Sequence, residues 1–225
     1  MTGLLGAMPS EVAGWLEALE GARPAELLGT RLHLGRLRGQ EVAVACSGIG
    51  KVNAALSAAA LIAAGAGALL CAGVAGGLGD LQSGDLVVGS ELLQYDADVT
   101  ALGYPAAQLP GEPALWTAPL GLVEQALSAA AALGFRAVAG RIGSADRFLA
   151  DSAYAARLRE TLDLRCVEME GAAVAQVAAR CGVPALVLRA VSDAGGDAAG
   201  GQYRQSLDQV AARASQLAAA LLASW

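Results

Sequence analysis

Residues 40–72 read QEVAVACSGIGKVNAALSAAALIAAGAGALLCA, and this stretch decides the fold class. It begins with an apolar run at 40–46, turns through glycines into an alanine-rich segment at 51–64, and ends in a second apolar run at 68–72. Short apolar runs bounded by glycine predict buried strands, and the proline-free, alanine-rich segment predicts a helix. This succession is typical of an α/β protein whose helices cover a mostly parallel sheet.

The same alternation continues on both sides of this stretch. Further strands are expected at 2–6, 30–37, 85–93, 135–143, 164–168 and 183–190. Further helices are expected at 115–132, 151–160 and 170–181. A final helix is indicated by one apolar stripe, formed by Tyr203, Leu207, Val210, Ala214, Leu217 and Leu221. We therefore expect an α/β fold with a mixed, mostly parallel central sheet flanked by helices, in a single domain spanning 1–225.

One long connection is expected to be irregular. It runs from Ala97 to Pro119 and contains four prolines, at positions 105, 110, 113 and 119. Long loops in compact domains often serve as binding elements, so this segment is a candidate for a functional loop.

The interval between Lys51 and Asp80 contains no charged residue, and it is long enough to form a membrane-spanning helix. Several glycines interrupt it, and its second half has the pattern of a strand and a turn. We therefore expect a buried helix followed by a buried strand, and no membrane. The segment after Met1 lacks the basic start and apolar core of a signal peptide, so a cytoplasmic protein is expected.

Composition excludes several classes of partner and site. The formal net charge of −6 lacks the basic footprint of a protein that binds nucleic acid. The cysteines form no C-x-x-C pair, so we expect free thiols, mostly buried; they are Cys46, Cys71, Cys166 and Cys181. His33 is the one histidine, and a catalytic triad or multi-histidine metal site would depend on it alone. Gly65–Gly67 precedes a strand, whereas a dinucleotide fingerprint follows one. We expect no metal and no cofactor.

Acidic and glycine-rich segments follow several predicted strands. Ligands of open α/β sheets bind beyond the carboxyl ends of the strands, so these segments are candidates for a site. They are Gly6–Met8 leading to Glu11, Ser47–Lys51, Gly73–Gly77, Glu168–Glu170 and Arg189–Asp193.

Each of these segments also has a plain structural explanation. The turn Gly48–Lys51 can offer amide groups to an anion or a ribose hydroxyl, or it can be only a tight connection into a helix. Glu170 can stabilise the N-terminus of the helix that it opens, and Asp193 can form a turn. Two acids on neighbouring strand ends, with Arg189 between them, favour a site.

Together these segments resemble the nucleoside phosphorylase superfamily, and within it the bacterial 5′-methylthioadenosine/S-adenosylhomocysteine nucleosidases, over nearly the whole chain. The matching motifs are Gly6–Met8 with Glu11 and Val12, Ser47–Ala55, Asp96–Ala101 with Gly103 and Tyr104, Gln108–Gly111, Phe148, Val167–Glu170 and Arg189–Asp193. The run Asp-Ala-Asp-Val-Thr-Ala with the turn Gln-Leu-Pro-Gly is distinctive of this subfamily.

The resemblance implies a nucleoside phosphorylase-like fold and a metal-independent hydrolase. Its substrates would be methylthioadenosine and adenosylhomocysteine, and its products adenine and a 5-thioribose compound, as in methionine salvage. By matching positions, Asp193 would protonate N7 of the departing adenine and Glu11 would deprotonate the attacking water. Adenine is a poor leaving group as an anion, and a positioned acid or base typically contributes about 10²- to 10⁴-fold in rate.

The resemblance also implies the substrate-binding residues. Glu170 would bind the ribose hydroxyls, with Arg189 near them and near the water. The base and sugar would further contact Met8, Ile49, Gly76, Phe148, Leu149, Met169, Ser192 and Tyr203. In relatives a loop of a second subunit completes the pocket for the 5′-alkylthio group. A homodimer would use Val99, Leu102, Tyr104 and Pro110 for this purpose, unless the loop packs on its own domain.

Two positions depart from the family pattern. Val74 stands where relatives commonly have a hydroxyl residue, and Leu102 where they have an aromatic residue, so substrate preference follows less directly than reaction type. A futalosine-type hydrolase, a purine nucleoside phosphorylase and a non-catalytic nucleoside-binding protein on the same scaffold are the alternatives. Glu11 favours hydrolysis, because a carboxylate repels the phosphate that a phosphorylase must bind.

Overall fold

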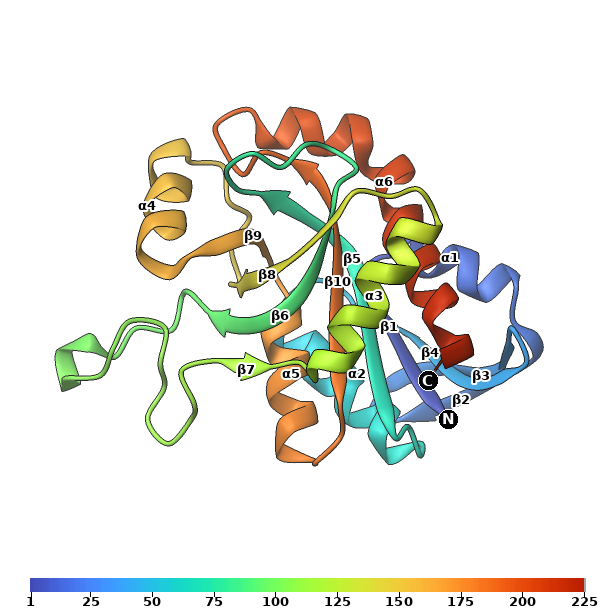
Figure 1. The fold of residues 1–225 in the computed structure, drawn as a ribbon. Coiled ribbons are helices and arrows are strands. Elements are labelled where there is room, and N and C mark those ends of the chain that lie inside the picture. The colour runs from blue at the N-terminus through green and yellow to red at the C-terminus, as the bar shows by residue number, and fades with distance from the viewer. Residues whose placement is uncertain (225) are drawn as a thin grey trace.

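The computed structural model describes residues 1–224 (Figure 1). Its strands are β1 (Thr2–Gly6), β2 (Glu20–Leu27), β3 (Thr30–Leu37), β4 (Gln40–Cys46), β5 (Ala68–Gly77), β6 (Leu86–Gln94), β7 (Trp116–Thr117), β8 (Ala137–Ser144), β9 (Leu164–Glu168) and β10 (Ala185–Asp193). Its helices are α1 (Pro9–Glu17), α2 (Lys51–Ala63), α3 (Leu120–Ala132), α4 (Ser152–Leu162), α5 (Gly171–Arg180) and α6 (Ala199–Leu221). Short 3₁₀ turns occur at η1 (Thr100–Leu102) and η2 (Leu222–Ser224).

The strands form one mixed sheet in the order β10-β6-β8-β9-β5-β1-β4-β3-β2, with β7 paired to β6. Strand β5 is central, because it pairs in parallel with β1 and β10 and antiparallel with β9. Strand β10 also pairs with β6, and β8 pairs with both β6 and β9. The strands β5, β10, β6, β8 and β9 therefore form a closed ring, and the carboxyl ends of β5, β9 and β10 meet at one place.

The expectation that two acids lie on neighbouring strand ends is wrong in one detail. Gly76 of β5 pairs with Val167 of β9 and with Asp193 of β10, so β5 separates the strands that lead to Glu170 and end at Asp193. Strand β9 runs antiparallel to β5 and reaches this place from the opposite direction, which a simple parallel order does not foresee.

Helices cover both faces of the central sheet, which explains its nearly continuous apolar runs. Leu4 and Leu186 point into a core with α1, α3 and α6, whereas their neighbours Leu5 and Val187 point into a core with α2 and α5. Side chains alternate between the faces of a strand, so each run supplies both cores. Figure 1 shows α4 apart from these layers, beyond β8 and β9.

Most expected elements are present. Four strands have the expected bounds, namely 2–6, 30–37, 40–46 and 164–168. Strands β5 and β10 extend beyond the expected ends. The prediction ended them too early, because glycines and polar residues are uncommon inside strands and usually indicate that a strand has ended. Helix α1 and strand β2 were not predicted, and β2 is an exposed, polar edge strand that lacks a burial pattern. The expected helix at 115–132 starts later, since Trp116–Thr117 pairs with β6 as β7.

The uncharged interval forms a helix and a strand, as expected. Residues 51–63 form α2 and residues 68–77 form β5, and both contribute to the cores. No helix among residues 1–224 is both long enough and apolar enough to cross a membrane. The cysteines are free; Cys71 and Cys166 are buried, whereas Cys46 and Cys181 are exposed, so the expectation of mostly buried thiols holds for half of them.

Candidate active site

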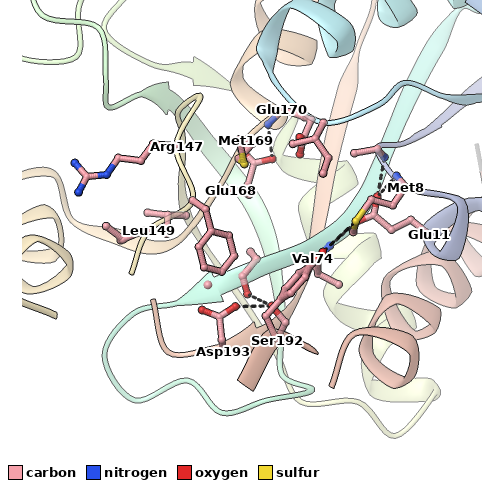
Figure 2. Close-up of a pocket in the computed structure, with 17 residues that line it drawn as sticks. Met8, Glu11, Val74, Arg147, Leu149, Glu168, Met169, Glu170, Ser192 and Asp193 are labelled. Atoms are coloured by element: carbon pink, nitrogen blue, oxygen red, sulfur yellow. Dashed lines mark hydrogen bonds between the residues drawn. The ribbon is translucent and has the colours of Figure 1, made fainter. Parts of the chain in front are cut away.

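A pocket opens where the carboxyl ends of β5, β9 and β10 meet (Figure 2). Its walls come from the turn before α1, the turn before α2, the loop before α4 and the start of α6, besides these strands. The lining residues are Ala7, Met8, Glu11, Ile49, Val74, Ala75, Gly76, Arg147, Phe148, Leu149, Val167, Glu168, Met169, Glu170, Ser192, Asp193 and Tyr203.

Glu11 is held in one wall of the pocket by three backbone amides. It is the third residue of α1, and its Oε2 accepts hydrogen bonds from the amides of Ala7 at 2.6 Å and Met8 at 2.9 Å. Its Oε1 accepts a third from the amide of Val74 in β5 at 3.0 Å. Burial raises the pKa of Glu11, while Arg189 and these amides oppose the rise. The result is a buried, fixed carboxyl group that can accept a proton.

Asp193 ends β10 and is 5% exposed. Its Oδ1 accepts a hydrogen bond from the amide of Gly195 at 2.9 Å, so it does form the turn that the sequence suggested. The hydroxyl of Ser192 lies 2.7 Å from Oδ2 and 3.2 Å from the carbonyl oxygen of Ala75. Asp193 therefore combines a turn with a place in the pocket lining.

Arg189 lies behind the pocket wall, between carboxylates. Its Nε donates to Glu168 Oε2 at 3.0 Å, its Nη2 donates to the same oxygen, and Nη2 lies 3.4 Å from Glu170 Oε2. Burial alone would lower the pKa of Arg189, but the adjacent carboxylates of Glu168, Glu170 and Glu11 raise it well above its ordinary value. The resemblance predicts that Arg189 lies near the ribose and the water. In the part of the chain that the structure describes, Arg189 does not belong to the residues that line the pocket.

Glu170 stands at the N-cap of α5 but makes no side-chain cap of that helix. Its Oε1 instead accepts a hydrogen bond from the amide of Gly50 at 2.9 Å. Burial, and then the charge of Glu168, raise the pKa of Glu170 to about 7. The carboxylate therefore serves the pocket rather than its own helix.

The turn Gly48–Lys51 uses its amides within the protein. The amide of Gly50 donates to Glu170, and that of Lys51 donates to Asp146 Oδ1 at 2.8 Å. Both carboxylates belong to this chain, so these two amides are bonded within the protein, as in the alternative of a tight connection into the helix. The turn connects the Glu170 wall to the loop before α4.

Aromatic and thioether side chains line the remaining wall. Phe148 and Tyr203 meet edge to face, with ring centroids 5.7 Å apart, and the Tyr203 hydroxyl lies 3.1 Å from Met8 Sδ. Phe148 is 47% exposed, whereas Leu149 beside it is buried. Flat apolar surface of this kind suits an aromatic base.

The loop that was expected to complete a second subunit's pocket lies away from this one. Figure 1 shows the segment around η1 projecting from the body of the protein. None of the four residues predicted from it belongs to the lining set of the described chain: Val99, Leu102, Tyr104 and Pro110. Leu102 is 72% exposed.

Several lining residues were not singled out as site residues from the sequence. They are Ala7, Val74, Ala75, Arg147, Val167 and Glu168. Glu168 lies in the motif 167–170, and its charge next to an apolar strand was a visible signal. Ala7, Val74 and Ala75 lie in the candidate segments Gly6–Met8 and Gly73–Gly77, but their apolar side chains do not by themselves indicate ligand contact.

Known proteins resemble this chain over nearly its whole length. The phosphorylase superfamily model matches residues 2–224. The chain is 40% identical over 223 residues to the 5′-methylthioadenosine/S-adenosylhomocysteine nucleosidase of Geobacillus kaustophilus, covering 97% of this chain and 95% of the relative.

Solved structures are similar over the whole chain. The nucleosidase of the same name from Neisseria meningitidis, in complex with methylthio-immucillin-A, has a TM-score of 0.96 at 35% identity, covering 100% of this chain and 99% of that one. The futalosine hydrolase of Helicobacter pylori has a TM-score of 0.95 at 31% identity, covering 100% and 97%.

Proposed function

Since this chain belongs to the phosphorylase superfamily, we propose that it hydrolyses the N-glycosidic bond of 5′-methylthioadenosine and S-adenosylhomocysteine, releasing adenine and a 5-thioribose product. One observation carries the proposal. Two buried acids, Glu11 and Asp193, line separate parts of one pocket (Figure 2), and the aromatic ring of Phe148 also lines it. The relatives from Geobacillus and Neisseria, named as nucleosidases for these substrates, support it.

Asp193 is the proposed acid that protonates N7 of adenine. Its Oδ2 faces the Ser192 hydroxyl, which has one proton and also lies near the Ala75 carbonyl oxygen. The Ser192 hydroxyl can therefore donate to Ala75 while Asp193 directs its proton to N7, and to Asp193 Oδ2 once that proton has been transferred. The base would lie against Phe148 with Leu149 at its edge.

Glu11 is the proposed base that activates water. Three amides hold its carboxylate, so it is positioned before substrate arrives. As the glycosidic bond breaks, the ribose becomes positively charged, and the carboxylates of Glu11 and Glu170 stabilise that charge. A carboxylate in this place repels phosphate, which favours hydrolysis over phosphorolysis.

Two residue sets are proposed to hold the rest of the substrate. Glu170 accepts hydrogen bonds from the ribose hydroxyls, and Met8, Ile49 and Met169 contact the sugar and its 5′ substituent. Gly76, Ser192 and Tyr203 complete the wall around the base. The proposed mechanism uses no metal and no cofactor.

We also propose a homodimer in which the loop around η1 enters the partner's pocket. Exposed apolar side chains support this proposal. Val52 on α2 is 78% exposed, Leu56 one turn later is 44% exposed, and Leu102 in the loop is 72% exposed. Such side chains favour burial in an interface. Val99, Tyr104 and Pro110 would join Leu102 there. Each subunit would be one domain that spans residues 1–225. The protein would act in the cytoplasm, and cell fractionation can test this location.

A futalosine-type hydrolase is the second candidate, favoured by the similarity to the futalosine hydrolase of Helicobacter pylori. Both activities break the same kind of bond, and they differ in the 5′ substituent that the pocket must accept. Leu102, which departs from the nucleosidase pattern, would contact that substituent in the partner's pocket, whereas Val74 would affect how the water or the ribose is held.

A product assay distinguishes these candidates. The purified protein is incubated with methylthioadenosine, adenosylhomocysteine, aminodeoxyfutalosine and inosine, each with and without phosphate, and the products are separated by chromatography. We expect adenine from the first two without phosphate. A requirement for phosphate and a ribose 1-phosphate product would show phosphorolysis, and binding without turnover would show a binding protein.

A further inference from the structure

Glu168 is more completely bonded than any acid proposed for the reaction. Its Oε2 accepts hydrogen bonds from Nε and Nη2 of Arg189 and from the amides of Glu170 at 3.1 Å and Gly171 at 2.7 Å. Its Oε1 accepts one from the Ser144 hydroxyl. The side chain is 2% exposed. Five hydrogen bonds from the protein thus hold this carboxylate, four of them to Oε2, although Glu168 lies in the pocket lining.

These bonds place Glu168 between Arg189 and Glu170, whose opposite charges attract each other. The Arg189 guanidinium donates twice to Glu168, whereas Glu170 Oε2 accepts only one longer hydrogen bond from it, at 3.4 Å. Arginine forms strong two-donor pairs with carboxylates, so Glu170 would take Arg189 if Glu168 did not hold it. The second Glu170 oxygen is already bonded to the Gly50 amide. A closer bond to Arg189 would leave the Glu170 carboxylate without a good acceptor for substrate.

Glu168 also provides the cap that Glu170 does not make. The first amides of α5 are those of Gly171, bonded to Glu168, and Ala172, bonded to Ser144 Oγ at 2.7 Å. Free amides at a helix N-terminus attract carboxylates, so this cap removes a second competitor for Glu170.

We propose that Glu168 is a positioning residue, which holds the Arg189 guanidinium and the N-terminus of α5 and thereby leaves the Glu170 carboxylate available to the ribose hydroxyls. This inference rests on the proposed function, in which Glu170 binds those hydroxyls. It predicts that a change at Glu168 weakens recognition of the hydroxyls more than it weakens the rest of the reaction.

The experiment compares substrates with and without a ribose hydroxyl. The kcat/KM for methylthioadenosine and for its 2′-deoxy and 3′-deoxy analogues is measured for the wild type and for Glu168→Gln. We expect the wild type to prefer methylthioadenosine over at least one analogue by about 10-fold to 100-fold, the value of a charged hydrogen bond. In Glu168→Gln we expect the preference to fall to about threefold or less, because Arg189 moves to Glu170.

Glu91→Gln is the matched control, since Nε and Nη2 of Arg141 both donate to one Glu91 oxygen, at 3.0 and 2.8 Å, outside the pocket. This variant should keep the wild-type preference. If Glu168→Gln does not fold, Glu168→Asp is measured, because it retains the charge but withdraws it from Arg189. There the preference should fall at least threefold.

The outcomes separate the two proposals. A wild type that releases no adenine contradicts the proposed function, and the inference with it. An active wild type whose preference is absent, or survives unchanged in Glu168→Gln or in its replacement Glu168→Asp, overturns the inference alone. An equal loss on all three substrates also overturns it, since a purely structural role has that effect.

Discussion

The Ser192 hydroxyl lies 2.7 Å from Oδ2 of Asp193, its neighbour in the chain, and both side chains are buried. Consecutive residues of a strand normally point to opposite faces. Here the register between β10 and β5 shifts between Val191 and Asp193, and this irregularity allows the two side chains to meet. The proposed acid and its hydrogen-bond partner therefore depend on a break in a regular strand.

Replacing the proposed acid tests the reaction most directly. Asp193→Asn keeps the shape but cannot supply the proton, so kcat for adenine release should fall by about 10²- to 10⁴-fold. Binding of a non-hydrolysable substrate analogue, followed by calorimetry, should be largely retained, because the lost proton acts in the transition state. Asp163→Asn is the control, because that exposed residue at the end of α4 adopts a left-handed conformation that asparagine tolerates. Unchanged turnover in Asp193→Asn would remove Asp193 from the mechanism.

Removing the partner should have a smaller effect than removing the acid. Ser192→Ala deletes one hydrogen bond to Asp193, which is worth about 1 kcal/mol, so kcat should fall about fivefold. Steady-state kinetics with methylthioadenosine measure it. Ser215→Ala, which removes a hydroxyl bonded within α6 far along the chain, should leave kcat unchanged. A loss equal to that of Asp193→Asn would indicate that Ser192 itself does the chemistry.

Gly73 provides space for the charged centre. A Cβ at this position would overlap both the Arg189 guanidinium and the Glu11 carboxylate, which cannot move without losing their partners. Gly73→Ala should therefore lower kcat/KM by about 10²-fold or more, since a displacement of about 1 Å can cost that much. Gly14→Ala on α1 is the control, because its Cβ meets nothing and alanine favours a helix. Equal activity of the two variants would contradict the close approach.

Stability should depend on pH through Glu170. Burial, and then Glu168, raise its pKa from 4.5 to about 7, while Arg189 and the Gly50 amide oppose the rise and Glu11 adds to it. A raised pKa in the folded state stabilises the fold at pH below 4.5, and this stability is lost as the pH rises to about 7. Glu170→Gln should remove this loss, so its gain in free energy of unfolding over the wild type should grow across this range.

Urea unfolding at several pH values measures this difference. The expected size is about 1.4 kcal/mol for each unit of pKa shift. Glu124→Gln, an exposed position on α3, should show no growth with pH. A constant difference between Glu170→Gln and the wild type from pH 4.5 to 7 would contradict a raised pKa.

One added charge in the proposed interface should dissociate the dimer. Val52→Glu places a carboxylate on the most exposed large apolar side chain of α2, at 78% exposure, and should shift the protein to monomer. Activity at low concentration should fall, because each pocket would lose its partner's loop. Leu120→Glu on α3, at a position 71% exposed, is the matched control and should remain dimeric. Sedimentation measures both, and a fully active monomeric wild type would contradict the shared site.

Much of the fold follows from local sequence. The runs at 2–6, 30–37, 40–46 and 164–168 predicted strands with the observed bounds, because buried residues recur continuously, as in 2–6, or at alternate positions, as at the start of 30–37. The polar strand β2 escaped prediction, since it lies exposed at the sheet edge and local pattern reports burial. The ends of β5 and β10 were also missed, because they carry the glycines and acids of the pocket.

The sequence by itself determined which acids stand after which strands and, through resemblance, the chemistry proposed for them. Only the tertiary structure decided their partners. Glu168 rather than Glu170 caps α5, Arg189 lies behind the wall, and Gly76 has β9 on one side and β10 on the other. The physical reason is that strand and helix propensities act between near neighbours in the chain. The ring of β5, β10, β6, β8 and β9 instead joins residues that are far apart in sequence, and its closure brings the ends of β5, β9 and β10 together at the pocket.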